Sequence, residues 1–261
     1  MAGKETELIK KIPAGKKVLL LTDFDGTLSP IAPTPDLAVL PSLAKNALIK
    51  LSAAKNTVAG VISGRSLREI KRTTGIKGLI YAGNHGLEIE GRGLKKIVPV
   101  PAATRSALIK IRRSLKGALL KYKGVIIEDK GVSLSVHYRL AGQRDILEVI
   151  KDVKLAAAPF LRKKQVRLAK GKKIVEIRPY LKWNKGHAVN WIRRALKAKG
   201  SGQDYFTVYM GDDITDEDAF KALRSAGLAV KIGSKAGSRA SETLADTGKA
   251  GRFLALLAKR G

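Results

Sequence analysis

A short apolar run that stops at two carboxylates is the feature that most constrains the fold of this chain. Residues 18–21 are all apolar and lead, through one threonine, into Asp-Phe-Asp-Gly-Thr at residues 23–27. Such a run is typical of a strand buried on both faces, as in a parallel sheet. Positions i and i+2 of an extended backbone project to the same side, so Asp23 and Asp25 can face one cavity. These residues alone leave two interpretations open: a site at the carboxyl end of a strand, where open α/β sheets keep their ligand crevices, and a solvated turn.

Further apolar runs alternate with stretches of helical periodicity on both sides of a central segment. This alternation predicts an α/β fold with a doubly wound, mostly parallel sheet. The lead-in before the first strand, residues 1–17, is expected to be polar and partly frayed. The expected strands are 18–21, 57–62, 79–82, 206–210 and 228–232, and the expected helices are 42–54, 66–73, 184–197, 219–226 and 251–259.

The central segment follows a different pattern, in which a helix precedes a pair of strands twice in succession. The helices are expected at 101–122 and 143–157, and the strand pairs at 124–128 with 132–139 and at 166–169 with 173–178. This order predicts a small α+β domain with an antiparallel sheet. We therefore expect residues 1–98 to form the first half of a core domain, 99–180 an inserted domain, and 181–261 the second half of the core.

The chain carries an unusually large positive charge. It has 51 Lys and Arg against 22 Asp and Glu, a net charge of +29, and residues 91–180 alone hold 23 basic and 6 acidic side chains. Basic surfaces attract nucleic acids and other polyanions. However, aromatic residues, which stack on single-stranded bases, make up only 5% of the chain. No zinc-finger, basic-zipper or RNP-type pattern is present. We expect a solvated basic surface and no specific nucleic-acid partner.

The composition also bounds the cellular context. The chain contains no cysteine, so disulfides and thiolate metal sites are excluded. It shows no apolar run of the ~20 residues that a membrane span needs, and no apolar stretch typical of a signal peptide near residue 1. We expect a cytoplasmic protein that does not bind a membrane, and a monomer.

Four motifs in order make the interpretation specific. Asp-Phe-Asp-Gly-Thr at 23–27, Ser-Gly-Arg at 63–65, Lys185, and Gly-Asp-Asp-Ile-Thr-Asp-Glu-Asp at 211–218 resemble the four motifs of the haloacid-dehalogenase-like phosphatases. The α+β insertion resembles the C2-type cap of that superfamily. Within it, these motifs together with Gly-Asn-His-Gly at 83–86 and Glu-Ile-Arg-Pro at 176–179 are most similar to those of trehalose-6-phosphate phosphatases. The resemblance implies a Rossmann-type core with a cap domain, and hydrolysis of trehalose 6-phosphate.

The chemistry of the acidic residues agrees with this. A carboxylate such as Asp23 can attack phosphorus and form an aspartyl-phosphate, and Asp25 can act as general acid and then as general base. Two carboxylates and a phosphate repel one another unless a cation lies between them, and Mg²⁺ prefers such oxygen ligands. The resemblance implies Mg²⁺ bound by Asp23, the main-chain carbonyl of Asp25, and Asp212. It also implies that Asp213 and Asp216 hold water molecules or orient Lys185.

The phosphoryl oxygens are expected to contact Ser63 and Lys185. Taken alone, Ser63 would more often be a helix N-cap and Lys185 a solvated surface lysine. The motifs favour catalytic roles for both. The resemblance further implies substrate binding by a set of polar residues: Arg65, Asn84, His85, Gly86, Glu176 and Arg178.

Two alternatives stay open at this point. One is a related capped phosphatase for another sugar phosphate, such as sucrose 6-phosphate or mannosyl-3-phosphoglycerate, for which Glu176 and Arg178 are the discriminating residues. The other is a basic nucleic-acid-associated protein on the same fold, since a fold and its motifs do not prove an activity.

Overall fold

The chain forms two compact units. The computed structural model describes residues 3–200, 204–223 and 227–260 of the 261. The first unit comprises Met1–Ile31, Ala38–Ile97 and Trp183–Gly261, and the second comprises Ala32–Leu37 and Val98–Lys182. The second unit thus interrupts the first in sequence. The assignment of residues 99–180 as a cap domain stays a prediction.

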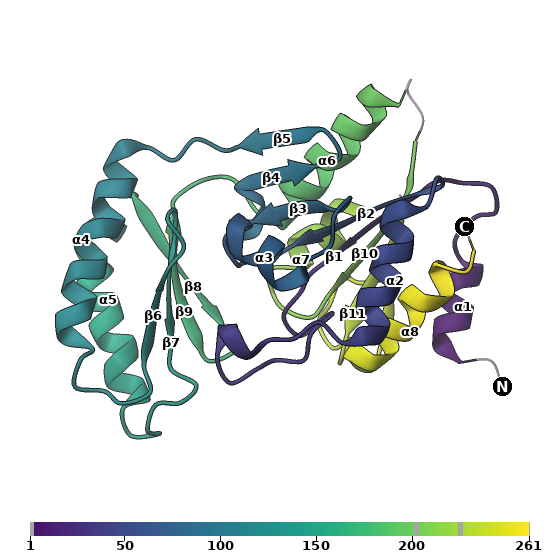
Figure 1. Cartoon of the computed structure of the whole chain (residues 1–261). Helices are drawn as coiled ribbons and strands as arrows, with labels where there is room; N and C mark the ends of the chain where they lie inside the picture. Colours follow the sequence, from purple (N-terminus) through teal and green to yellow (C-terminus); the bar gives the residue numbers. More distant parts are fainter. Residues whose placement is uncertain (1–2, 201–203, 224–226, 261) are drawn as a thin grey trace. The chain divides into compact units, whose positions relative to one another are not determined.

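An eight-stranded sheet forms the centre of the first unit (Figure 1). Its strand order is β12-β11-β10-β1-β2-β3-β4-β5, and the six strands from β12 to β3 are parallel, whereas β4 and β5 are antiparallel. This confirms the predicted α/β fold with a mostly parallel sheet. The strands are β1 Val18–Thr22, β2 Thr57–Ile62, β3 Ile80–Gly83, β4 Glu88–Gly91, β5 Leu94–Ile97, β10 Phe206–Gly211, β11 Gly227–Ile232 and β12 Glu242–Leu244.

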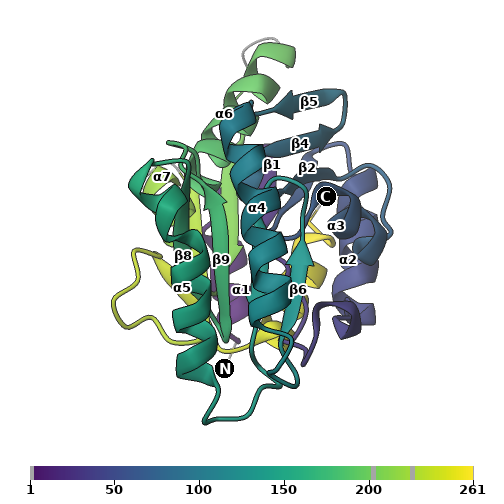
Figure 2. The ribbon, with the colours of Figure 1, turned by 90° about the vertical axis from the view of Figure 1, so that its left-hand side faces the viewer.

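Helices cover both faces of this sheet, because its central strands are apolar on both sides. Leu19 and Leu21 of β1 share one buried cluster with Val189 and Ile192 of α6 and with Phe220 of α7. On the other face, α2 and α8 pack against each other, and α1 packs on α8 (Figures 1 and 2). The helices are α1 Lys4–Lys10, α2 Ser42–Ala53, α3 Leu67–Thr74, α6 Lys185–Lys199, α7 Glu217–Leu223 and α8 Thr247–Leu257.

Several details of the first unit differ from the prediction, among them strand β12, which was not predicted. The lead-in contains α1, in which Leu8 is the fully buried apolar side chain. The helix was not predicted because most of its residues are polar. The hairpin of β4 and β5 was not predicted. Helix α8 begins at Thr247, four residues earlier than expected, because Asp246 caps it by accepting a hydrogen bond from the Lys249 N–H at 2.8 Å. The expected helix 219–226 lies on α7, but residues 224–226 are outside the described residues.

The second unit is a four-stranded antiparallel sheet covered on one face by two helices (Figure 2). Alternate residues of β7 and β9, among them Val136 and Val175, pack in the core with α4 and α5, which leaves Ser135 and Glu176 on the opposite face. Both predicted strand pairs are present, whereas α4 ends four residues earlier than expected and α5 extends to Arg162. The elements are η1 Pro35–Leu37, α4 Ala102–Ala118, β6 Ile126–Asp129, β7 Leu134–His137, α5 Ile146–Arg162, β8 Val166–Gly171 and β9 Ile174–Pro179.

Candidate active site

The carboxyl ends of the parallel strands bring distant residues of the first unit to one edge of the sheet. Strand β1 lies between β2 and β10, and its last residue, Thr22, is in register with Val61 and with Met210. The N–H of Asp23 continues this pairing by donating to the Met210 carbonyl at 2.8 Å. The polar residues that directly follow these strands therefore become neighbours. They are Asp23 after β1, Ser63 after β2, Asn84 after β3 and Asp212 after β10.

Lys185 is buried in this cluster, so it is not the solvated lysine that its residue type alone would suggest. It is the first residue of α6, and its side chain is only 2% exposed. Its Nζ lies 2.9 Å from Asp23 Oδ1 and 2.8 Å from Asp216 Oδ1. Burial would lower the pKa of the Lys185 ammonium, but the two carboxylates raise it well above its ordinary value. Lys185 is therefore a fixed positive charge beside Asp23.

Asp23 lies where negative charge accumulates. Burial raises the pKa of its carboxyl well above the ordinary value; Lys185 opposes this rise, and Asp216 and Asp212 add to it. One lysine thus faces several carboxylates in a nearly closed space. The excess of negative charge in this cluster favours the binding of a divalent cation, whose positive charge would balance it.

Asp216 is held by four hydrogen bonds. Its Oδ1 accepts from Lys185 Nζ at 2.8 Å and from the Tyr209 hydroxyl at 2.6 Å. Its Oδ2 accepts from the backbone N–H groups of Asp212 and Asp213, both at 3.0 Å. Burial raises the pKa of the Asp216 carboxyl to about 6, although Lys185 opposes the rise. A carboxylate offers about four lone-pair positions, so the donors found here occupy them all.

Asp213 has a different environment from that of Asp216. Its Oδ1 accepts from both the backbone N–H and the hydroxyl of Thr215, at 2.8 and 2.6 Å. Burial opposes ionisation of Asp213, but Lys185 and the two Thr215 donors lower the pKa of its carboxyl overall. Asp213 therefore stays ionised and fixes the turn that leads into α7.

The donor set of the cluster fits a hard divalent cation. Carboxylate oxygens of Asp23, Asp212 and Asp216 all lie within 4.8 Å of one another, and all three residues are buried. Since the lone pairs of Asp216 are already occupied, Asp23 and Asp212 are the members that could bind a metal directly. Thr27 orients Asp212, because its hydroxyl donates to Asp212 Oδ1 at 2.9 Å.

Two glycines make room for these carboxylates. Gly26 has a φ of +86°, and a Cβ at this position would lie 2.2 Å from Asp212 Oδ2. A Cβ on Gly211 would likewise lie 2.2 Å from Cγ of Asp216. Real Cβ atoms do not approach other atoms this closely, so any larger residue must displace the carboxylate. The glycines are therefore part of the site's geometry.

The substitution Gly26→Ala is expected to weaken the binding of a divalent cation by roughly 10- to 100-fold, the usual effect of disturbing groups that orient a metal ligand. The new methyl group must push Asp212 away, and the left-handed backbone adds about 1 kcal/mol of strain. Calorimetric titration with Mg²⁺ measures the effect. Gly237→Ala is the matched control, because Gly237 has a φ of +70° but nothing within 4 Å of an added Cβ. Equal losses in both variants would contradict the role of the Asp212 contact.

Asp25 is engaged by Arg65 in a two-point ion pair. Nε of Arg65 donates to Asp25 Oδ2 at 2.8 Å and Nη2 donates to Oδ1 at 2.7 Å. Nη1 of the same guanidinium donates to Glu69. Burial would lower the pKa of Arg65, but Asp25 and Glu69 raise it above its ordinary value. Asp25 keeps 39% of its side chain exposed, so it can be reached by a ligand. Arg65 was predicted to bind substrate, and here it binds two carboxylates of its own chain.

The loops after β2 and β3 are tied to each other. His85 N–H donates to the Ser63 carbonyl at 2.9 Å, and Asn84 N–H donates to the Arg65 carbonyl at 2.7 Å. Ser63 is buried and its hydroxyl accepts from the Arg65 N–H at 3.1 Å, whereas the N-cap of α3 is Ser66. The N-cap interpretation of Ser63 is therefore wrong. These bonds hold Ser63 near the sheet edge.

The Asn-His-Gly segment, 3₁₀ helix η2 at Asn84–Gly86, is rigidly anchored. Asn84 is buried and donates through Nδ2 to Glu88 Oε2 at 2.8 Å. Trp183 Nε1 donates to the Gly86 carbonyl at 2.8 Å. Contact of Asn84, His85 and Gly86 with a substrate stays a prediction.

Glu176 and Arg178 lie on β9 in the second unit and are paired with each other. Arg178 Nε donates to Glu176 Oε2 at 2.9 Å, and its Nη2 donates to the same oxygen. Lys130 Nζ and the Ser135 hydroxyl approach Glu176 Oε1 at 3.4 Å. This polar cluster occupies the face of the second sheet that the helices leave uncovered. Its role in sugar binding stays a prediction.

Two residues of the cluster were not identified from the sequence. Thr27 belongs to the Asp-Phe-Asp-Gly-Thr motif, and its fixed offset from the two aspartates was a usable signal. Tyr209 gave no signal, because a tyrosine in an apolar strand is most simply interpreted as core.

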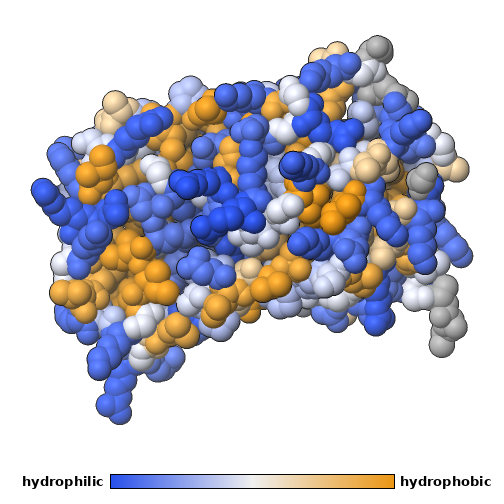
Figure 3. Space-filling view, in the orientation of Figure 1, coloured by the Kyte–Doolittle hydropathy of each residue, from blue (hydrophilic) through white to orange (hydrophobic). Residues whose placement is uncertain are grey.

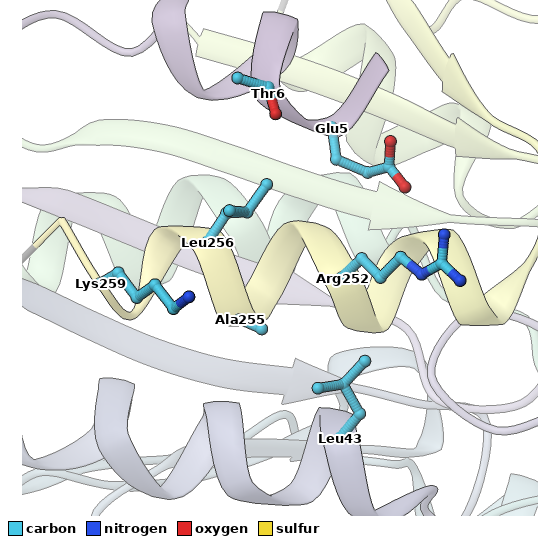
Figure 4. A pocket seen from close by; sticks show the side chains of 7 residues that line it. All are labelled: Glu5, Thr6, Leu43, Arg252, Ala255, Leu256 and Lys259. Carbon is cyan, nitrogen blue, oxygen red and sulfur yellow. The ribbon is translucent and has the colours of Figure 1, made fainter. Parts of the chain in front are cut away.

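A separate pocket of about 310 Å³ lies between α1, α2 and α8 (Figure 4). Apolar side chains of α2 and α8 and charged side chains of α1 and α8 line it. None of the candidate site residues lines this pocket, so it is not part of the acidic cluster. Its lining residues are Glu5, Thr6, Leu43, Arg252, Ala255, Leu256 and Lys259.

A parallel α/β sheet that carries Asp-x-Asp after its central strand, with a buried lysine and a second acidic loop at the same edge, defines the haloacid-dehalogenase-like class. A profile of the trehalose-phosphatase family matches residues 21–250. The chain belongs to this family. That match confirms the resemblance drawn from the four motifs.

Individual relatives agree with the family assignment. Trehalose-phosphate phosphatase B of Arabidopsis thaliana is 33% identical over 257 residues, covering 92% of this chain and 66% of that protein. Trehalose-phosphate phosphatase of Mycolicibacterium paratuberculosis is 39% identical over 212 residues, covering 81% of this chain and 52% of that protein. The chain thus spans about two thirds and about half of these relatives.

A solved structure confirms the fold. The C-terminal domain of the Candida albicans trehalose-6-phosphate phosphatase superposes with a TM-score of 0.84 at 26% identity, covering 99% of this chain and 97% of that domain. Among the residues described, no helix combines the length and the apolar character needed to cross a lipid bilayer.

Proposed function

We propose that this chain hydrolyses trehalose 6-phosphate to trehalose and inorganic phosphate. The observation that carries the proposal is the buried cluster in which Lys185 joins Asp23 to Asp216, within 4.8 Å of Asp212, in a member of the trehalose-phosphatase family. Phosphoryl transfer needs a nucleophile in line with the leaving group, a proton donor and positive charge on the equatorial oxygens. Asp23, Asp25 and Lys185 are the candidates for these three roles.

In the first step, a carboxylate oxygen of Asp23 attacks phosphorus, and the bond between phosphorus and the sugar oxygen breaks. Asp25 donates a proton to the departing oxygen, so the sugar leaves as a neutral alcohol. The product on the protein is an aspartyl-phosphate at Asp23. Lys185 and the Ser63 hydroxyl bind the phosphoryl oxygens during the transfer.

In the second step, Asp25 accepts a proton from a water molecule, whose oxygen attacks phosphorus. The acyl phosphate bond breaks, and Asp23 is released as a carboxylate together with inorganic phosphate. Dividing the hydrolysis in this way replaces one difficult displacement by two easier ones.

The first step requires a change in the arrangement described here. Asp25 must carry a proton to act as general acid, whereas its two-point pair with Arg65 suits the ionised carboxylate. We propose that this pair opens when substrate binds, which frees Arg65 to contact the substrate.

The residues present fit Mg²⁺. Asp23, Asp212 and the main-chain carbonyl of Asp25 would hold it, and Asp213 and Asp216 would keep these ligands in place. When bound, the ion supplies positive charge that offsets the repulsion between the carboxylates and the phosphate.

We propose that Asn84, His85, Gly86, Glu176 and Arg178 take part in sugar-phosphate binding. We also propose a cytoplasmic location and a monomer, with no specific nucleic-acid partner.

Phosphate release from a panel of sugar phosphates, with Mg²⁺ and with EDTA, tests the function. We expect turnover to be strongest on trehalose 6-phosphate and to disappear in EDTA. Preference for sucrose 6-phosphate or mannosyl-3-phosphoglycerate would overturn the proposed substrate but not the proposed mechanism. If no member of the panel is hydrolysed by the folded protein, the proposal fails, and a salt-sensitive gel shift would test the nucleic-acid alternative.

A further inference from the structure

Tyr209 is a buried polar group that the proposed chemistry does not use. It lies on β10, three residues before Asp212, and its side chain is fully buried. Its ring packs edge-on against Phe220 of α7, with centroids 5.8 Å apart and an interplanar angle of 77°. This packing leaves the ring little freedom and directs its hydroxyl to one place. That place is Oδ1 of Asp216, 2.6 Å away.

Oδ1 of Asp216 therefore has two donors on the same atom, Tyr209 and Lys185. The other oxygen is held by the backbone of the loop that carries Asp212 and Asp213. With both oxygens anchored, the carboxylate plane is fixed, and with it the position of the Lys185 ammonium beside Asp23. Without the hydroxyl, Lys185 would be the single donor found on Oδ1, and that oxygen and the ammonium bound to it would be less tightly restrained.

We infer that Tyr209 is a positioning residue, whose hydroxyl fixes the Asp216 carboxylate and through it holds Lys185 against Asp23. The expected effect on kcat rests on the proposed function, whereas the expected effect on the position of the Lys185 ammonium does not. Tyr209 is not assigned a proton-transfer role. It acts by fixing the position of the Lys185 ammonium, which must be in place when the phosphoryl group is transferred.

The test compares Tyr209→Phe with a matched control, Tyr81→Phe. The Tyr81 hydroxyl is also buried and also makes a 2.6 Å hydrogen bond, to the Ile76 carbonyl before the start of β3. Both variants lose one buried hydroxyl from the same unit, so melting temperatures should fall by similar amounts. Only Tyr209→Phe should lower kcat, by roughly 10-fold or more, with KM changed less than about threefold. Tyr81→Phe should keep kcat within about twofold.

A second readout does not depend on turnover. In a ¹H–¹⁵N spectrum of the side-chain ammonium groups, the buried Lys185 signal should shift or broaden in Tyr209→Phe and stay unchanged in Tyr81→Phe. Coincident Lys185 signals in wild type and Tyr209→Phe would overturn the inference, and so would equal kcat losses in the two variants. If wild type hydrolyses nothing on the panel, the proposed function fails, while the Lys185 signal still decides the role of Tyr209.

Discussion

Replacing Asp23 by asparagine is expected to reduce phosphate release by on the order of 10³-fold or more, the scale of loss seen when a covalent nucleophile is removed. The amide cannot displace the sugar oxygen and form the acyl phosphate, and it is also a weaker ligand for a cation. The fold should survive. Burial already raises the pKa of the Asp23 carboxyl, so the site disfavours its charge, and a neutral group of the same shape removes repulsion with Asp212 and Asp216.

The measurement is steady-state phosphate release together with a thermal melt. We expect the melting temperature of Asp23→Asn to equal or exceed that of wild type. Turnover within about tenfold of wild type would rule out Asp23 as the nucleophile. A collapsed melting temperature would contradict the electrostatic description of the cluster, because the variant would then have removed a stabilising charge.

Replacing Lys185 by methionine is expected to lose both activity and stability. The ammonium is the buried partner of Asp23 and Asp216 at 2.9 and 2.8 Å, and removing it leaves buried carboxylates without their cation. Breaking a buried pair by removing one partner costs about 3–5 kcal/mol. Lys197→Met is the matched control on the same helix, because Lys197 pairs with Asp204 at 3.0 Å while remaining 52% exposed. Exposed pairs contribute about 0–1 kcal/mol.

The stability loss of Lys185→Met should also depend on pH in a defined direction. The pKa values of Asp23 and Asp216 are raised already, that of Asp216 to about 6, and without the ammonium both must rise further. An acid whose pKa is higher in the folded state than in the unfolded state stabilises the fold while it is protonated. This stabilisation is lost as the pH rises through the folded-state pKa. Urea unfolding in EDTA should therefore show a larger deficit at pH 8 than at pH 5. A deficit that is independent of pH would contradict this account.

The site residues that directly follow strands could be predicted from the sequence. Which partner each side chain binds could not. Asp23, Ser63 and Asp212 each follow an apolar run, and parallel strands must place such residues at one edge. The pairing of Arg65 with Asp25, 40 positions apart, depends on which partner a long side chain takes. No periodicity or propensity encodes that choice.

The fold shows the same division. Long apolar runs predicted the central strands of the sheet, because burial on both faces leaves a strong signal. Helix α1 was missed because one buried leucine among charged residues does not produce a pattern. The hairpin of β4 and β5 lies at the sheet's edge, where half-exposed residues such as Glu88 and Lys96 make the sequence resemble that of a loop.

The pairing of β1 with β10 has a consequence for the growing chain. Val18 is in register with Thr57 on one side and with Phe206 on the other, so the first strand meets one neighbour early and the other only after a further 149 residues. At a synthesis rate of roughly 5–20 residues per second, the last residue of the second unit is synthesised about 1–5 seconds before the first residue of β10. Until α6 and the loop after β10 emerge, a nascent chain holds Asp23, the proposed nucleophile, without Lys185, Asp212 and Asp216. A ribosome-bound or prematurely terminated fragment that ends within the second unit therefore lacks most of the proposed active site.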